Sequence, residues 1–109
     1  MNKFVAKANK PRESMNQTES AYALYLEALK RSGRVLRYDF EPVKLRLADA
    51  TYYTPDFRVL AQDGTLEFHE VKGFWRDDAR VKIKVAAEMH PYRFLAVKKT
   101  KNGWEHEEI

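Results

Sequence analysis

The spacing of hydrophobic and polar residues along the chain predicts a mixed α/β structure. Apolar residues recur at helical spacing between residues 21 and 29, and again between residues 81 and 89. Short runs rich in β-branched and aromatic residues favour strands at 35–40, 43–47, 56–60, 65–72 and 92–97, with 104–109 as a possible last edge strand. The expected order, α-β-β-β-β-α-β with this possible final strand, is typical of a layered α/β domain.

The first helix is expected to begin near residue 14 and to stop at Gly33, because glycine favours the C-terminal end of a helix. The segment from Ser14 to Gln17 matches a capping box, and Asn16 and Thr18 are alternative caps. The predicted inward stripe consists of Ala21, Tyr22, Tyr25, Ala28 and Leu29.

A second helix is predicted from a cap at Asp77 or Asp78 to about Met89, where His90 and Pro91 end it. Its inward side chains are expected to be Val81, Val85 and either Ala86 or Met89. Its more exposed side chains are expected to be Arg80, Lys82 and Lys84.

Residues 56–72 are predicted to form a β-hairpin that turns at Asp63-Gly64, a strong short-range hairpin signal. The length of the loop sets the register of the two strands. A two-residue loop places Asp56 opposite Val71, whereas the three-residue loop 62–64 pairs Asp56 with Glu70. The longer loop ends in a left-handed position that glycine suits, so we expect the register that pairs the two acids.

Glu70 and Lys72 lie two residues apart on the second strand of this hairpin, so their side chains project from the same face of the sheet. Leu66 and Phe68 precede them on that face. This arrangement predicts a buried face that opens into a cleft at one end. His69 points to the opposite face and is given no catalytic part.

The distribution of charge along the chain indicates more about function than the net charge does. The 20 basic and 16 acidic residues give a net charge of +4. Residues 1–13 have little apolar periodicity, so we expect a flexible basic arm there and one domain over residues 14–109. Basic zones around an acidic centre suit a protein that grips a phosphate backbone and holds a cation, and ordinary solvated surface is the alternative. The side chains expected to contact nucleic acid are Lys3, Lys7, Lys10, Arg12, Arg80, Lys82 and Lys84.

Several classes of protein are excluded by composition. The chain has no cysteine, so it has neither a disulfide framework nor a thiolate zinc site. Its three histidines, His69, His90 and His106, lack the spacing of metal ligands. No apolar run approaches membrane-spanning length, and the start lacks the apolar core of a signal peptide. We therefore expect a cytoplasmic protein that does not contact membranes.

Pro55-Asp56 on one strand and Glu70-x-Lys72 on the next resemble the signature of the PD-(D/E)xK nucleases. The pattern falls across a predicted hairpin, follows a helix that carries Glu19 and precedes a basic helix, which is the order of elements in that family's core. The chain looks most similar to the phage-encoded endonuclease I and Holliday-junction-resolvase branch, over roughly residues 18–97. The resemblance implies a restriction-endonuclease-like domain, with a mixed central sheet flanked by helices, and the cytoplasm of a bacterial host.

The resemblance also implies a Mg²⁺-dependent endonuclease that hydrolyses DNA phosphodiester bonds, with Mn²⁺ as a substitute. Asp56 and Glu70 would hold the ion, together with Glu19 and the main-chain carbonyl of Val71, since Mg²⁺ prefers oxygen ligands. Lys72, which the neighbouring acids keep protonated, would orient the attacking water and offset charge in the transition state. The site residues of this hypothesis are therefore Glu19, Asp56, Glu70, Val71 and Lys72.

The expected substrate is branched DNA, such as a Holliday junction. Two symmetric cuts need two sites, so we expect a homodimer, with residues 35–47 or 104–109 available to pair across a two-fold axis. Two other classes stay open. One is a non-catalytic nucleic-acid-binding module that keeps the nuclease fold and uses Trp75 as a further contact. The other is an interaction protein with a structural ion-pair network.

Overall fold

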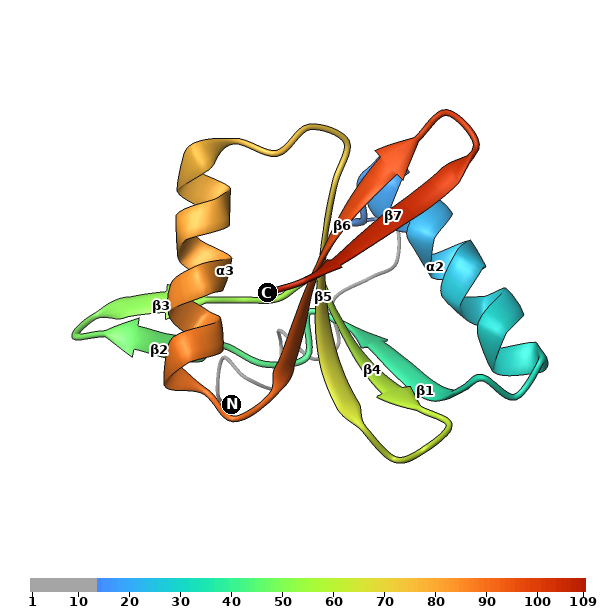
Figure 1. The fold of residues 1–109 in the computed structure, drawn as a ribbon, viewed down its shortest axis with the longest axis horizontal. Helices are drawn as coiled ribbons and strands as arrows, with labels where there is room; N and C mark the ends of the chain where they lie inside the picture. Colours follow the sequence, from blue (N-terminus) through green and yellow to red (C-terminus); the bar gives the residue numbers. More distant parts are fainter. Residues whose placement is uncertain (1–13) are drawn as a thin grey trace.

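Five strands form a mixed sheet with a helix on each face, and a small two-stranded sheet lies beside it (Figure 1). The structure is a computed structural model that describes residues 14–109, so the arm predicted at residues 1–13 lies outside the described residues. Within the described part of the chain, neither helix is long and apolar enough to cross a membrane. The elements are α2 (Gln17–Arg31), β1 (Val35–Phe40), β2 (Leu45–Ala48), β3 (Thr51–Tyr53), β4 (Phe57–Ala61), β5 (Leu66–Lys72), α3 (Asp77–Met89), β6 (Arg93–Thr100) and β7 (Gly103–Glu108).

The larger sheet has the strand order β1-β4-β5-β6-β7. Neighbouring strands run antiparallel except β5 and β6, which are parallel and connected through α3. A parallel pair needs a crossover of this kind, because a short turn cannot return the chain to the same end of the sheet. The predicted α/β class is confirmed. The predicted last strand at 104–109 is confirmed as the edge strand β7, which pairs with β6 beyond the turn at Lys101 and Asn102.

Helix α2 covers one face of the larger sheet through Tyr22, Ala23 and Leu26, which are all buried. These side chains pack against five sheet residues, namely Val35, Phe57, Val59, Val71 and Val97. Tyr22 lies in this core as predicted, and Tyr25 and Leu29 pack against its edge. The prediction for Ala28 is wrong because the contact face centres on Ala23 and Leu26, which leaves Ala28 exposed.

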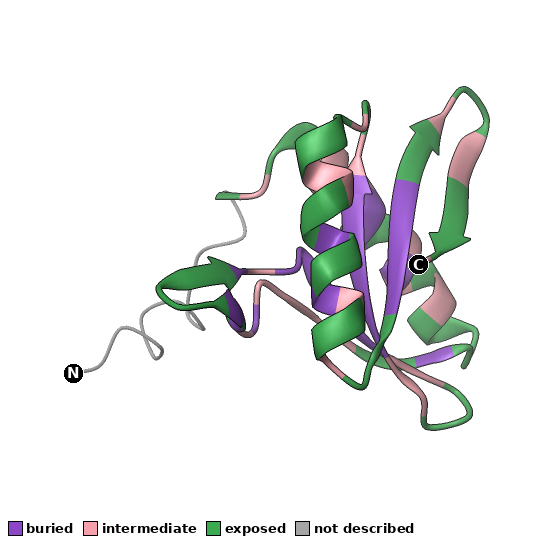
Figure 2. Cartoon of the chain, turned by 60° about the vertical axis from the view of Figure 1, so that its left-hand side comes forward, coloured by how far each residue is buried: buried purple, intermediate pink, exposed green. Residues whose placement is uncertain are grey.

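Helix α3 and the β2–β3 hairpin cover the opposite face. Ile83 and Ala86 of α3 are buried there against Phe68 and Phe94 of the sheet. Figure 2 shows that the side of α3 toward the sheet is buried and its outer side exposed. The hairpin contributes Leu45, Leu47 and Tyr53 to the same core. The two faces of the sheet therefore have separate cores of aliphatic and aromatic side chains.

Both predicted helix caps need correction. Helix α2 is capped by Asn16, the alternative, and its capping box joins Asn16 to Glu19 rather than Ser14 to Gln17. The Asn16 side chain accepts the Glu19 backbone N–H at 2.7 Å, and the Glu19 carboxylate accepts the Asn16 N–H at 2.9 Å. Helix α3 begins after Arg76, which makes no side-chain capping bond. Its two aspartates, Asp77 and Asp78, lie in the first turn, where they stabilise the helix dipole.

The predicted orientation of α3 is wrong for Val81 and Val85, whereas Ala86, one of the two alternatives for the third inward position, is confirmed. Val81, Val85 and Met89 are exposed, whereas Ile83 and Ala86 face the sheet. Polar contacts lie near both ends of the helix in this orientation. The Arg80 guanidinium donates to Glu107 of β7, and the His90 side chain hydrogen-bonds to the backbone carbonyl of Arg46 on β2. Ile83 and Ala86 lie between these two contacts in the sequence and face the core.

The β2–β3 hairpin differs from the expected single strand at 43–47. Strand β2 starts later, at Leu45, and pairs with β3, a three-residue strand that was not predicted. The turn between them places Ala50 at a φ of 54°, a left-handed conformation that L residues seldom adopt. Because no glycine marks this turn, the sequence carries no conventional signal for it.

Candidate active site

The register between β4 and β5 brings Asp56 opposite Glu70. Phe57 pairs with His69 and Leu60 with Leu66, and the same register extended by one residue aligns the two acids. The loop between the strands is the predicted three-residue loop, since the Ala61 N–H donates to the Thr65 carbonyl at 2.9 Å across it. Gly64 closes this loop with a φ of 89°. The register prediction is therefore confirmed.

Asp56 and Glu70 lie together beneath the surface, with exposed fractions of 6% and 8%. The Val71 backbone N–H donates to Oδ2 of Asp56 at 2.8 Å, and the Asp56 N–H donates to Oε1 of Glu70 at 3.2 Å. The Tyr53 hydroxyl donates to the same Oε1 at 2.8 Å. The Lys72 ammonium lies 3.4 Å from the other oxygen, Oε2. Each carboxylate is thus held in one orientation by backbone and side-chain donors.

The two acids are in an environment that resists ionisation. Burial, and next the negative charge of Glu70, raise the pKa of Asp56 to about 8. Burial also raises the pKa of Glu70, although the bonds from Tyr53 and Lys72 oppose that rise. Burial and the charge of Glu70 raise the pKa of Tyr53, so its hydroxyl stays protonated and acts as a donor. Without a cation, the pair therefore holds a proton at neutral pH.

Glu19 lies near this pair but is engaged elsewhere. Its carboxylate accepts the Asn16 N–H in the capping box of α2, and its charge raises the pKa of Asp56 only as a minor contribution. Within residues 14–109, no group of three or more histidine, aspartate and glutamate side chains is placed to hold a metal ion. The described structure thus brings together Asp56, Glu70 and Lys72, with the Val71 backbone beside them and Glu19 at longer range.

A cleft of about 410 Å³ opens beside Glu70 and Lys72. Its walls come from the β2–β3 hairpin on one side and the first turns of α3 on the other. The remaining lining residues are Tyr52, Tyr53, Thr54, Asp78, Ala79 and Lys82. The expectation that the face bearing Phe68 and Glu70 opens into a cleft at one end is confirmed.

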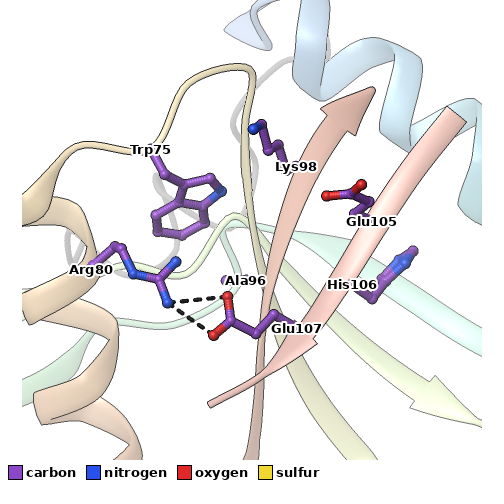
Figure 3. Close-up of a pocket in the computed structure, with 7 residues that line it drawn as sticks. All are labelled: Trp75, Arg80, Ala96, Lys98, Glu105, His106 and Glu107. Atoms are coloured by element: carbon purple, nitrogen blue, oxygen red, sulfur yellow. Dashed lines mark hydrogen bonds and ion pairs between the residues drawn. The ribbon is translucent and has the colours of Figure 1, made fainter. Parts of the chain in front are cut away.

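The basic residues predicted to contact nucleic acid differ in their surroundings. Lys82 lines the cleft, and Lys84 is exposed on α3. Arg80 lies in a neighbouring pocket, where its guanidinium bonds both oxygens of Glu107 at 2.9 and 3.1 Å and lies 5.9 Å from the Trp75 ring (Figure 3). Arg80 is thus already neutralised by a carboxylate. The other four predicted contacts, Lys3, Lys7, Lys10 and Arg12, lie outside the described residues.

Comparison with known protein families assigns the chain to one family. A family model described as "Protein of unknown function (DUF1064)" matches residues 2–104. The chain belongs to the DUF1064 family. No curated protein and no solved structure shows significant similarity to it. The function of this DUF1064 chain is therefore inferred from the geometry of the site.

Tyr53 is a site residue that reasoning from the sequence missed. It lies on β3, the unpredicted strand, and its hydroxyl reaches Glu70 from outside the larger sheet. Its neighbour Tyr52 was missed for the same reason. The run Tyr52-Tyr53-Thr54 directly before Pro55 was the available signal, because strand alternation sends one of two adjacent tyrosines inward.

A second polar cluster lies on the α2 face, away from the acids. The Tyr22 hydroxyl hydrogen-bonds to Nδ1 of His69 at 2.7 Å and to Nε2 of His106 at 2.9 Å. His69 Nε2 in turn contacts Glu67 at 2.8 Å, and Glu67 accepts a bond from Arg93 at 2.6 Å. The prediction that His69 points to the face opposite Glu70 and Lys72 is confirmed. Sequence spacing gave no indication that two of the three histidines meet across Tyr22.

Proposed function

We propose that this protein is a metal-dependent endonuclease that hydrolyses phosphodiester bonds of DNA, with a restriction-endonuclease-like fold. The observation that carries the proposal is the meeting of two buried carboxylates, Asp56 and Glu70, beside Lys72 at the end of a cleft. A mixed sheet in which an antiparallel hairpin carries these residues, followed by a helix and a parallel strand, supports the fold assignment.

The acid pair fits a divalent cation. The Val71 N–H donates to Oδ2 of Asp56, and no such bond to the other oxygen, Oδ1, is seen within residues 14–109, so Oδ1 is the oxygen proposed to face the cation. Two ionised carboxylates in a buried site repel each other, and a cation between them removes that penalty. Asp56 and Glu70 would hold the ion, and Mg²⁺ or Mn²⁺ suits such oxygen ligands. Glu19 and the Val71 carbonyl are proposed as supplementary ligands.

The chain's own groups have distinct parts in the proposed reaction. A bound divalent ion lowers the pKa of water and polarises the phosphate. Tyr53 and the Asp56 N–H fix Glu70 through Oε1, which leaves Oε2 facing the Lys72 ammonium. Lys72 lies at the cleft, where its positive charge orients the attacking water and offsets charge on the phosphate in the transition state.

We propose branched DNA as the substrate and a homodimer as the active form, because two related sites cut two strands symmetrically. Within residues 14–109, the larger sheet ends in strands β1 and β7. Strand β7 carries Glu105, Glu107 and Glu108, and the last two already form ion pairs with Arg80 and Arg93 of the same chain. Leu36 of β1 is half exposed, which makes its side chain a candidate for a contact at the two-fold axis.

The test uses labelled linear, nicked and four-way-junction DNA incubated with the protein and Mg²⁺, Mn²⁺ or EDTA. Cleavage with either metal and none with EDTA is expected, with the junction cut fastest. A protein that binds DNA but cuts none of the three substrates with any metal would instead be a non-catalytic binding module. Absence of DNA affinity at moderate salt would leave only the interaction protein.

A further inference from the structure

The outward face of the β2–β3 hairpin carries cations around an aromatic ring. Lys44, Arg46 and Tyr52 are exposed, whereas Leu45 and Tyr53 on the opposite face are buried. The Lys44 ammonium lies 5.0 Å from the centre of the Tyr52 ring and so covers one side of it. Tyr52 is 46% exposed, and no aromatic ring within residues 14–109 packs against it. The ring is therefore open to a flat partner.

The hairpin brings this ring to the candidate active site. Tyr53 bonds Glu70, so the hairpin is attached directly to one of the two acids. Tyr52 lines the same cleft as Glu70, Lys72 and Lys82. In Figure 1 the hairpin projects beyond the larger sheet beside α3. A nucleic-acid strand that reaches the acids thus has an aromatic ring and several cations beside it.

We propose that the β2–β3 hairpin binds unpaired nucleotides of the substrate, with a base stacked on Tyr52 and phosphates bound by Lys44 and Lys82. The proposal rests on the nuclease function above and names the part of the substrate that the site recognises. A base inside a duplex has both faces covered by its neighbours, so a tyrosine ring stacks only on an unpaired base. Basic side chains around an aromatic platform are the usual means of holding a single strand. Among residues 14–109, the acidic side chains that line the cleft are Glu70 and Asp78.

Binding is measured by fluorescence anisotropy in EDTA, so that no cleavage occurs, with a labelled single-stranded oligonucleotide and the matching blunt duplex. Tyr52→Ala is expected to weaken single-strand binding by about tenfold, the size of one lost base–aromatic contact, and duplex binding by less than about twofold. Tyr52→Phe keeps the ring and is expected to bind like the parent. Lys44→Ala is expected to weaken binding and to lower its dependence on salt.

Tyr92→Ala is the matched control. Tyr92 has a similar exposed fraction, 42%, but lies just before β6 and does not line the cleft. This variant is expected to bind both oligonucleotides like the parent. Circular dichroism melts establish that the variants are folded. If Tyr52→Ala unfolds, Tyr52→Phe still tests the proposal, because it removes only the hydroxyl group and keeps the ring. Loss of binding by Tyr52→Phe would contradict stacking.

Three further results would overturn the proposal. They are no single-strand binding by the parent, unchanged binding by Tyr52→Ala, and equal losses on single strand and duplex. Failure of this inference differs from failure of the nuclease function. If the parent cuts DNA and Tyr52→Ala binds normally, only the role of the hairpin is refuted. If the parent never cuts DNA but Tyr52→Ala selectively loses single-strand binding, the nuclease function is refuted and the role of the hairpin stands.

Discussion

Replacing Asp56 with asparagine should stabilise the metal-free protein, and the gain should grow with pH. The amide is nearly isosteric with the carboxyl group, and its oxygen can still accept the Val71 N–H. Its NH₂ group can donate toward Glu70, where the carboxylate of the parent repels its neighbour. The variant therefore removes a like-charge contact and keeps the packing.

The size of the effect follows from the pKa of Asp56, which rises from 3.8 to about 8 in the folded protein. Below pH 3.8 the group is neutral in both states, and the parent bears no penalty. Between pH 3.8 and about 8 the unfolded chain releases the proton that the folded chain keeps, so stability falls by about 1.4 kcal/mol per pH unit. Above pH 8 the penalty levels off on the order of 5 kcal/mol, a large part of a typical unfolding free energy.

Urea unfolding in EDTA at pH 6, 7.5 and 9 measures this difference. The free energy of unfolding of Asp56→Asn should exceed that of the parent, and the gap should widen by about 3 kcal/mol between pH 6 and pH 9. Adding Mg²⁺ at pH 9 should raise the free energy of unfolding of the parent and leave that of the variant unchanged, because only the parent has the Asp56 carboxylate as a metal ligand. A variant less stable than the parent at pH 9, or a gap that does not change with pH, would refute the reasoning.

Asp39→Asn is the matched control and should have the opposite sign. Burial alone would raise the pKa of Asp39, but hydrogen bonds from Arg37 and Arg58 outweigh it and hold the pKa below its usual value. Its contribution to stability is present above the unfolded pKa of 3.8 and is lost as pH falls through the lower folded pKa. At neutral pH this variant should be less stable than the parent.

Three further predictions concern activity and assembly. Lys72→Ala should lower kcat at least tenfold while Mg²⁺ affinity, measured by calorimetry, stays close to that of the parent; a loss mainly in Mg²⁺ affinity would contradict the role given to Lys72. Tyr53→Phe should lower kcat by several-fold with little change in substrate binding, since it frees the Glu70 carboxylate to rotate, and a parent-like kcat would show that Tyr53 does not position it. Light scattering should give a dimer on a four-way junction, and Leu36→Lys on β1 should reduce dimerisation, whereas a parent that stays monomeric on the junction would rule out the resolvase-like assembly.

Turn chemistry explains why the centre of the site was predictable from the sequence. A glycine at position 64, which the three-residue loop requires in a left-handed conformation, fixed the register that pairs Asp56 with Glu70. Strand alternation then separated Glu70 and Lys72 from His69. These are local rules, and each depends on residues within one hairpin.

The parts that were missed depend on contacts between distant segments. Two apolar stripes fit helical spacing on α3, one with Val81 and Val85 and one with Ile83 and Ala86, and packing against the sheet selects the second. Tyr53 was missed because its strand follows a turn without glycine, at Ala50. The capping box that engages Glu19 is a local exception: Asn16 and Glu19 match its sequence pattern, as Ser14 and Gln17 do, and the pattern alone does not choose between the two pairs.

The central claim is tested most directly by single-turnover cleavage of a labelled four-way junction by the parent, Glu70→Gln and Asp39→Asn, with Mg²⁺ and with EDTA. Glu70→Gln removes a proposed metal ligand but keeps an oxygen that can accept the Tyr53 hydroxyl, so it should remain folded. The parent and Asp39→Asn should cut in Mg²⁺ and stop in EDTA, and Glu70→Gln should be at least about a thousandfold slower. Equal rates for Glu70→Gln and the parent, or cleavage by the parent that continues in EDTA, would contradict the claim that the two buried acids form a metal-dependent nuclease site.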